Sequence, residues 1–249
     1  MSDADKSTKC WICGHPANTH EHRTKASDLR SLFGLPAQDD PIYFHTVKRK
    51  NFRVGSLKAP VLKFTNRICV RCNSSTTQPH DFAWQRFSEA LRARVPPIAP
   101  GSYIRPSRIF PYNSRRAMLN VHLYFLKIFG CQILEGNIQI DTMPFANAIL
   151  KGQPHPNVYL AFGPAPSGLP ARLAGSSDVN VAMLNGLCAF ATWLYHVGNL
   201  WVNVMYAIDG ERRDGLVDAW HPRFGFKRIP MKDFVPDEAA AVSSAARKS

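Results

Sequence analysis

The chain has 249 residues, which is enough for one large domain or two small ones. It contains 31 Lys and Arg residues against 18 Asp and Glu, a formal net charge of +13. The opening segment MSDADKSTK lacks the apolar core of a secretory signal, and no apolar run approaches the length needed to span a bilayer. We therefore expect a cytoplasmic protein with no membrane partner.

The positive charge is concentrated in the N-terminal half. Residues 1–116 hold 20 Lys and Arg against 8 Asp and Glu, a balance of +12, whereas the remainder holds 11 against 10, or +1. A basic lobe of this kind is typical of proteins that bind a polyanion, most often nucleic acid. The alternative is a surface whose charge serves solubility alone.

The N-terminal half predicts short elements between polar loops. We expect a strand or its end at 19–22, a short helix at 27–33, and a hairpin whose strands at 42–47 and 52–54 flank a basic turn. A further strand at 61–64 leads to a second cysteine pair. A helix from about 80 to 94 follows, with Pro79 in its first turn.

Two CxxC pairs are the strongest motif in the chain. Cys10 and Cys13 form the first pair, and Cys69 and Cys72 form the second. Each pair can offer two thiolates from a tight turn, so together they predict a tetrahedral structural zinc that joins distant segments. Cys131 and Cys188 stand alone, which argues against a disulfide framework. The alternatives are two unrelated turns or a redox pair.

Other polar groups flank these pairs. Glu21 and His22 follow the first pair, and Asn73 follows the second directly. An acid, an imidazole and an amide are groups that hold a catalytic divalent ion and activate a water beside it. Asp81 could complete the shell of that ion, or it could simply offset the dipole at the start of the helix.

The second half has a different character. Five prolines in 95–114 favour a linker or an extended wrapping segment, and we place a domain boundary there. A helix at 115–129, closing at Gly130, precedes predicted strands at 158–162, 188–196, 200–207 and 224–229. The histidines at 122, 155, 196 and 221 are scattered and predict packed or surface side chains. The tail 237–249 is predicted to be disordered.

The order CxxC, acid–His, then CxxCN entering a helix resembles an HNH endonuclease with a four-cysteine zinc. The resemblance covers roughly residues 8–94. It implies an α+β protein with a ββα-metal domain at 1–94, a linker at 95–114 and a C-terminal α+β domain with an antiparallel sheet at 115–236. A role in phage defence or in a mobile element would be in keeping with such an enzyme.

The resemblance also implies roles for individual residues. His22 would be the general base, and Glu21 and Asn73 would hold one Mg²⁺ or Mn²⁺ at the scissile phosphate of DNA. The cations expected to neutralise neighbouring phosphates are Arg23, Lys25, Lys48, Arg49, Lys50 and Arg71. Asn66 is a loose match to the middle residue of the motif.

The sequence departs from the family's pattern at some positions. Many members have Asp in place of Glu21, and the proline that often follows the acid–His pair is missing. Strand alternation would place Glu21 on the opposite side from His20 and His22, unless the pair lies where the strand bends. Otherwise His20 becomes the ligand. Two other classes stay open: a zinc-stabilised nucleic-acid-binding protein without catalysis, and a redox or chaperone-like protein.

Overall fold

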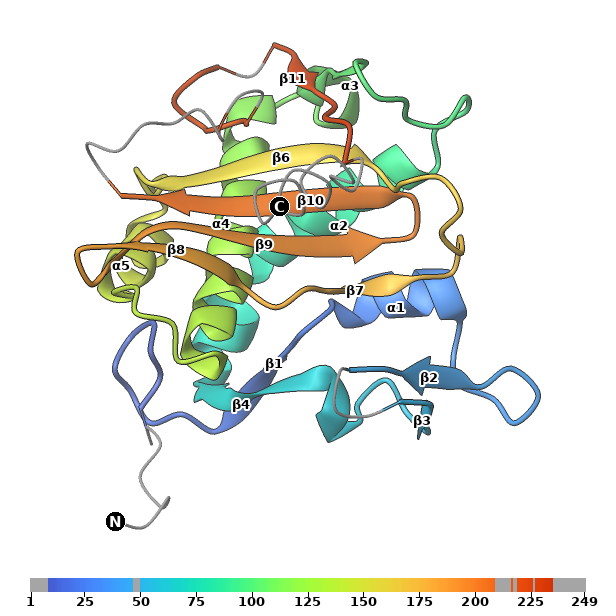
Figure 1. Ribbon diagram of the computed structural model, residues 1–249, viewed down its shortest axis with the longest axis horizontal. Coiled ribbons are helices and arrows are strands. Elements are labelled where there is room, and N and C mark those ends of the chain that lie inside the picture. Colours follow the sequence, from blue (N-terminus) through green and yellow to red (C-terminus); the bar gives the residue numbers. More distant parts are fainter. Residues whose placement is uncertain (1–8, 47–49, 209–215, 217–218, 226, 235–249) are drawn as a thin grey trace, which may run out of the picture.

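A computed structural model describes the chain except for residues 1–8, 47–49, 209–215, 217–218, 226 and 235–249. The described part is a mixed α+β structure with antiparallel sheets, which confirms the predicted fold class at that level (Figure 1). The helices are α1 (Ala26–Phe33), α2 (Gln78–Arg92), α3 (Pro106–Ile109), α4 (Ser114–Glu135) and α5 (Met143–Lys151). The predicted tail lies outside the described residues.

The main sheet has the strand order β6-β10-β9-β7, with β8 also paired to β9. Its strands are β6 (Val158–Pro164), β7 (Ala174–Ser176), β8 (Asn180–Leu184), β9 (Leu187–Val197) and β10 (Leu200–Ala207). All pair antiparallel, and β9 and β10 form the predicted hairpin through Gly198 and Asn199. Figure 1 shows α4 and α2 packed behind this sheet.

Helix α4 is the centre of the core. Every residue from Val121 to Ile133 is buried, so the helix is apolar on nearly all sides because other elements surround it. It continues through Gly130 to Glu135, beyond the predicted end. The expectation that no apolar run is long enough to span a membrane is wrong for α4. This helix is long and apolar enough to cross a membrane, judged by length and composition alone. Its burial inside the protein accounts for that composition.

The N-terminal half forms two small sheets. Strand β1 (Thr19–His22) pairs with β4 (Lys63–Ile68), and β2 (Ile42–Phe44) pairs with β3 (Phe52–Val54). The predicted strand at 61–64 begins later, because Pro60–Leu62 form a 3-10 turn. The predicted helix at 80–94 is confirmed as α2, with Pro79 in its first turn.

The segment 95–114 wraps over the end of α2 and α4. It contains the short strand β5 (Tyr103–Ile104) and helix α3. β5 pairs with β11 (Ile229–Pro230), so little of the strand predicted at 224–229 forms. The proposed division into domains stays a prediction, but a single hydrophobic core contains side chains from both halves of the chain.

Buried Asp28 on α1 joins the two halves. Its carboxylate accepts hydrogen bonds from Trp84 Nε1 at 2.7 Å, Ser88 Oγ at 3.1 Å and Tyr195 OH at 3.2 Å. Burial raises the pKa of Asp28, and these donors partly offset that effect. Helices α1 and α2 are therefore held to the main sheet by one carboxylate.

Gly130 permits close contact between α4 and the first cysteine knuckle. A Cβ at this position would overlap the ring of Trp11. Gly130→Ala should therefore lower the free energy of unfolding, because overpacking costs about 1–3 kcal/mol while helix propensity returns at most about 1 kcal/mol. Urea unfolding measures the change.

The Trp11→Leu background supplies the control. Removing the indole opens the space, so Gly130→Ala should there be neutral or stabilising. Equal destabilisation in both backgrounds would show that the two residues are not in contact.

Candidate metal centre and adjacent polar site

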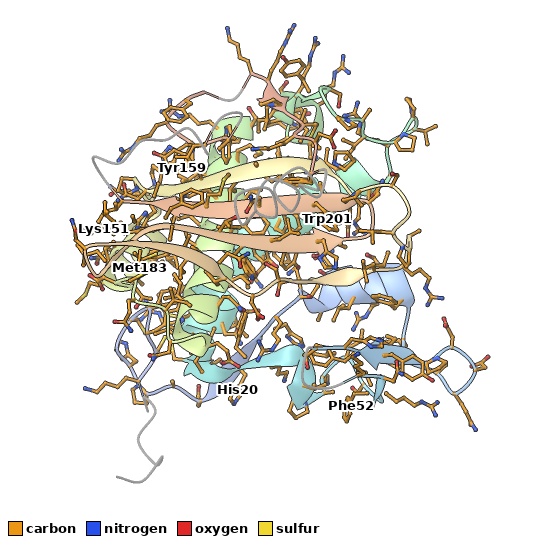
Figure 2. The ribbon with its side chains drawn as sticks, in the orientation of Figure 1. His20, Phe52, Lys151, Tyr159, Met183 and Trp201 are labelled. Atoms are coloured by element: carbon orange, nitrogen blue, oxygen red, sulfur yellow. The ribbon has the colours of Figure 1, made fainter. Side chains whose placement is uncertain are left out.

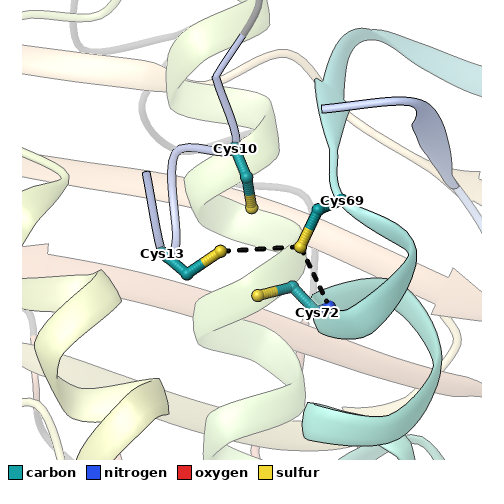
Figure 3. Close-up of side chains that lie close together, drawn as sticks. All are labelled: Cys10, Cys13, Cys69 and Cys72. Carbon is teal, nitrogen blue, oxygen red and sulfur yellow. Dashed lines mark hydrogen bonds between the residues drawn. The ribbon is translucent and has the colours of Figure 1, made fainter. Parts of the chain in front are cut away.

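The four predicted zinc ligands lie together (Figure 3). The sulfurs of Cys10, Cys13, Cys69 and Cys72 all lie within 4.8 Å of one another, and those of Cys13 and Cys69 are 3.5 Å apart. A zinc ion with Zn–S bonds near 2.3 Å separates its tetrahedral ligands by roughly 3.8 Å. The cluster can therefore hold a metal ion and is compatible with structural zinc.

Local backbone hydrogen bonds shape each knuckle for this purpose. Gly14 N donates to Cys10 O at 2.8 Å, and Gly14 has the left-handed φ of 75° that closes the first turn. In the second knuckle, Cys72 N donates to Cys69 Sγ at 3.3 Å (Figure 3). The four-cysteine cluster thus connects the loop before β1 to the turn that precedes α2.

Strand β1 presents its polar residues on two sides. Glu21 is buried, whereas His20 and His22 are half-buried, which follows the expected alternation. The pairing of β1 with β4 shifts register between His20 and His22, and His22 is the last residue of the strand. Glu21 and His22 therefore lie at an irregular strand end, with Glu21 directed to the buried side of β1.

The His22 ring is oriented by a backbone carbonyl. His22 Nε2 lies 3.0 Å from Leu57 O, and a carbonyl can only accept, so Nε2 carries the proton and Nδ1 has the free electron pair. Burial lowers the pKa of His22, opposed by the Leu57 hydrogen bond and by Glu21. The imidazole is accordingly neutral near pH 7 and can accept a proton.

Lys127 binds the two acidic residues that sequence analysis proposed as ligands. This fully buried lysine on α4 places Nζ 2.7 Å from Glu21 Oε2 and 2.8 Å from Asp81 Oδ1. Although burial disfavours the ammonium, Glu21 and Asp81 outweigh it and raise the pKa of Lys127. The three groups together carry one net negative charge.

Lys127 and Glu21 also contact the second cysteine knuckle and the backbone of His22. Lys127 Nζ also donates to Thr77 Oγ1 at 3.3 Å, and Thr77 Oγ1 donates to Cys72 O at 2.8 Å. On the other side, His22 N donates to Glu21 Oε1 at 3.0 Å. A continuous set of contacts therefore runs from the cysteine knuckle to the backbone of His22.

The two asparagines face different partners. Asn73 Nδ2 donates to Thr19 Oγ1 at 3.2 Å and to His20 O at 3.3 Å, which fixes the start of β1 against the second knuckle. Asn66 Nδ2 donates to Cys131 O at 2.8 Å and thus binds β4 to α4. Asn73 therefore contacts the backbone and a hydroxyl of β1, while Asn66 connects β4 to α4.

The predicted phosphate-binding cations have mixed surroundings. Arg23 forms an ion pair with Glu135, and Lys25 is half-buried. Lys50 and Arg71 are exposed. Lys48 and Arg49 lie outside the described residues.

A groove of about 880 Å³ begins immediately after His22 on β1. Arg23, Lys63 and Arg172 supply cations to its lining, and Phe33 and Tyr43 supply aromatic rings. Asp40 and Asp178 also line it, and Asp40 forms an ion pair with Arg172. The combination of cations and aromatic rings is suited to a nucleic-acid strand, because guanidinium and ammonium groups bind phosphates and aromatic rings stack on bases. His20, labelled in Figure 2, lies on β1 in the two-stranded sheet that β1 forms with β4.

The sequence does not predict the ion pairs of Lys127 or the grouping of His122, His155 and His221. His155 N donates to His122 Nε2 at 3.2 Å, and His221 Nε2 lies 2.8 Å from His155 O. They are packed residues, as predicted, but they are not scattered. The unusual lysine within an apolar helix was the available signal for the buried ion pair.

Comparison of the chain with protein-family models, with curated proteins and with solved structures finds no match. Functional conclusions therefore rest on the geometry of the site.

We predict that the purified protein carries one zinc per chain and that Cys69→Ser loses it. Structural zinc can supply about 10–16 kcal/mol of apparent binding free energy, so the variant should unfold at a markedly lower temperature. Metal analysis and thermal melting measure both effects. Cys188→Ser is the control. Cys188 lies outside the cluster, so this variant should keep the zinc of the wild type.

Lys127→Met should destabilise the fold by about 3–5 kcal/mol, because it leaves buried Glu21 and Asp81 without their cation. The triple variant Lys127→Met, Glu21→Gln, Asp81→Asn removes all three charges and should recover much of that loss. Chemical unfolding measures the free energy of unfolding of the single and triple variants. A single variant as stable as the wild type would contradict the buried ion pair.

Proposed function

We propose that this protein is a metal-dependent endonuclease of the HNH type that hydrolyses phosphodiester bonds in DNA. The observation that carries the proposal is the position of His22. It is a neutral imidazole at an irregular strand end, oriented by the Leu57 carbonyl, and the next residue, Arg23, lines a groove with Lys63. Its Nδ1 has the electron pair that a general base needs.

The arrangement around His22 supports the same class. Strands β1 and β4 pair antiparallel, and α2 follows β4 after the second cysteine knuckle. Helix α1 and strands β2 and β3 lie between β1 and β4 in the chain. The paired strands, the helix that follows them and the four cysteines are nevertheless what the resemblance to HNH endonucleases implies for residues 8–94. The HNH assignment rests on this order together with the motif residues.

A divalent ion would have to share Glu21 with Lys127. Glu21 Oε2 binds the lysine, and Oε1 accepts from His22 N, although a carboxylate oxygen can accept more than one partner. Asn73 Nδ2 donates to Thr19 Oγ1 and His20 O, which leaves its amide oxygen as the atom that would act as a ligand. Glu21 and Asn73 therefore offer oxygen ligands of the kind that Mg²⁺ prefers.

In the proposed reaction, His22 Nδ1 takes the proton of the attacking water. The Leu57 carbonyl holds the ring and stabilises the imidazolium that forms. Arg23 and Lys63 in the groove would bind the backbone phosphates near the scissile bond. A bound divalent ion supplies stabilisation of the added negative charge on the phosphate and of the leaving 3′-oxygen. The products would be a 5′-phosphate and a 3′-hydroxyl.

A second candidate is a zinc-stabilised nucleic-acid-binding protein without catalysis. The observation that favours it is Lys127, whose ammonium already neutralises part of the charge on Glu21 and Asp81. In this function the acidic residues serve the fold, and the basic surface provides the binding.

Plasmid cleavage in Mg²⁺ or Mn²⁺ separates the two functions. We expect the wild type to nick or linearise plasmid DNA and His22→Ala to lose activity by about 10²-fold or more, since general bases typically contribute 10²–10⁴-fold. His15→Ala is the matched control, because His15 is an exposed histidine before β1 and should leave cleavage unchanged.

Equal cleavage by the wild type and His22→Ala would contradict the assignment of the base. Binding to DNA that weakens steeply with salt, with no cleavage in either metal by a zinc-loaded wild type, would establish the second function instead.

A further inference from the structure

A second basic pocket lies away from the site described above. It has a volume of about 390 Å³, and Arg94, Arg105, Arg108 and Arg228 line it together with Tyr103. Its apolar lining includes Leu91, and none of the described residues that line it is acidic. In Figure 1, β11 and α3 lie at the opposite end of the molecule from β1 and β4.

Three separate segments bring these arginines together. Arg94 lies just after α2, and Arg228 lies just before β11. Arg105 immediately precedes α3, and Arg108 lies within it. Ile229 pairs with Ile104 and Pro230 with Tyr103, and a continuation of this antiparallel register by one residue would set Arg228 across from Arg105. Like charges directly opposite each other on paired strands destabilise the pairing.

A structural role accounts for only part of this set. Arg94 and Arg108 lie at helix C-terminal ends, where a cation offsets the helix dipole. Arg105 and Arg228 have no such position. All four arginines are exposed, and none forms an ion pair with a carboxylate in the part of the chain that the structure describes.

Tyr103 adds a flat surface to this charge. Its side chain is 54% exposed, although tyrosine usually buries most of its ring. An exposed aromatic ring beside several arginines is the combination by which proteins hold single-stranded nucleic acid, with the base stacked and the phosphates on guanidinium groups.

We propose that this pocket binds a nucleotide unit of a nucleic-acid strand, with its phosphates on the four arginines and its base on Tyr103. The proposal rests on the proposed function only for the choice of nucleic acid as the source of the phosphates. It gives the protein a second contact with its substrate, remote from His22, that anchors the strand without taking part in cleavage.

The test is fluorescence anisotropy with a labelled single-stranded oligodeoxynucleotide, without added Mg²⁺ or Mn²⁺ and over a series of KCl concentrations. The double variant Arg105→Gln, Arg228→Gln should bind at least about tenfold more weakly. Its log–log salt slope should fall by about 1.4, because each phosphate contact on a single strand contributes about 0.7. Tyr103→Leu should weaken binding by about tenfold with an unchanged slope.

The matched control is Arg30→Gln, Lys151→Gln, which removes the same charge from exposed positions outside the pocket. It should keep the wild-type slope. Equal losses in both double variants would overturn the proposal, since the effect would then be one of overall charge. Wild-type binding by the pocket variant would overturn it as well.

Titration with a free mononucleotide and with pyrophosphate distinguishes a strand from a small ligand. Tight mononucleotide binding that the pocket variant loses, with strand binding intact, would overturn the assignment to a strand. Failure of the nuclease proposal is seen separately, as a wild type that binds the oligonucleotide through the pocket but cleaves no plasmid.

Discussion

The fold around the candidate site depends on a buried lysine that joins the second cysteine knuckle to the strand bearing His22. Lys127 lies on α4, and its Nζ contacts Glu21, Asp81 and Thr77. Thr77 in turn binds the carbonyl of Cys72. The four-cysteine cluster and the polar site are therefore one connected unit, and a change in either is expected to disturb the other.

This connection explains why the two halves of the chain pack as they do. A buried ammonium is costly unless carboxylates surround it, so α4 must lie where β1 and α2 can both supply one. Asp28 on α1 similarly accepts hydrogen bonds from Trp84 on α2 and from Tyr195 on β9. Charged groups of the N-terminal half thus find their partners in the C-terminal half, in addition to the shared hydrophobic core.

Residue spacing was sufficient to predict the cysteine cluster, because two CxxC turns constrain their own geometry whatever lies between them. The β9–β10 hairpin and α2 were likewise predictable from local patterns. Lys127 was not, since its partners lie 46 residues or more away in the chain and only tertiary packing identifies them. The end of α4 was missed for a related reason: Gly130 looks like a helix stop, but its lack of a side chain serves contact with Trp11.

Metal binding at Glu21 tests the account most directly, because the lysine and the proposed catalytic ion must share one carboxylate. A crystal soaked in Mn²⁺, with anomalous data collected at the manganese and zinc edges, would locate both metals. The account predicts zinc among the four sulfurs and manganese bound by oxygens of Glu21 and Asn73, with Lys127 still on Asp81. Zinc among the sulfurs with no manganese at Glu21 would contradict it and leave a zinc-stabilised basic protein without nuclease chemistry.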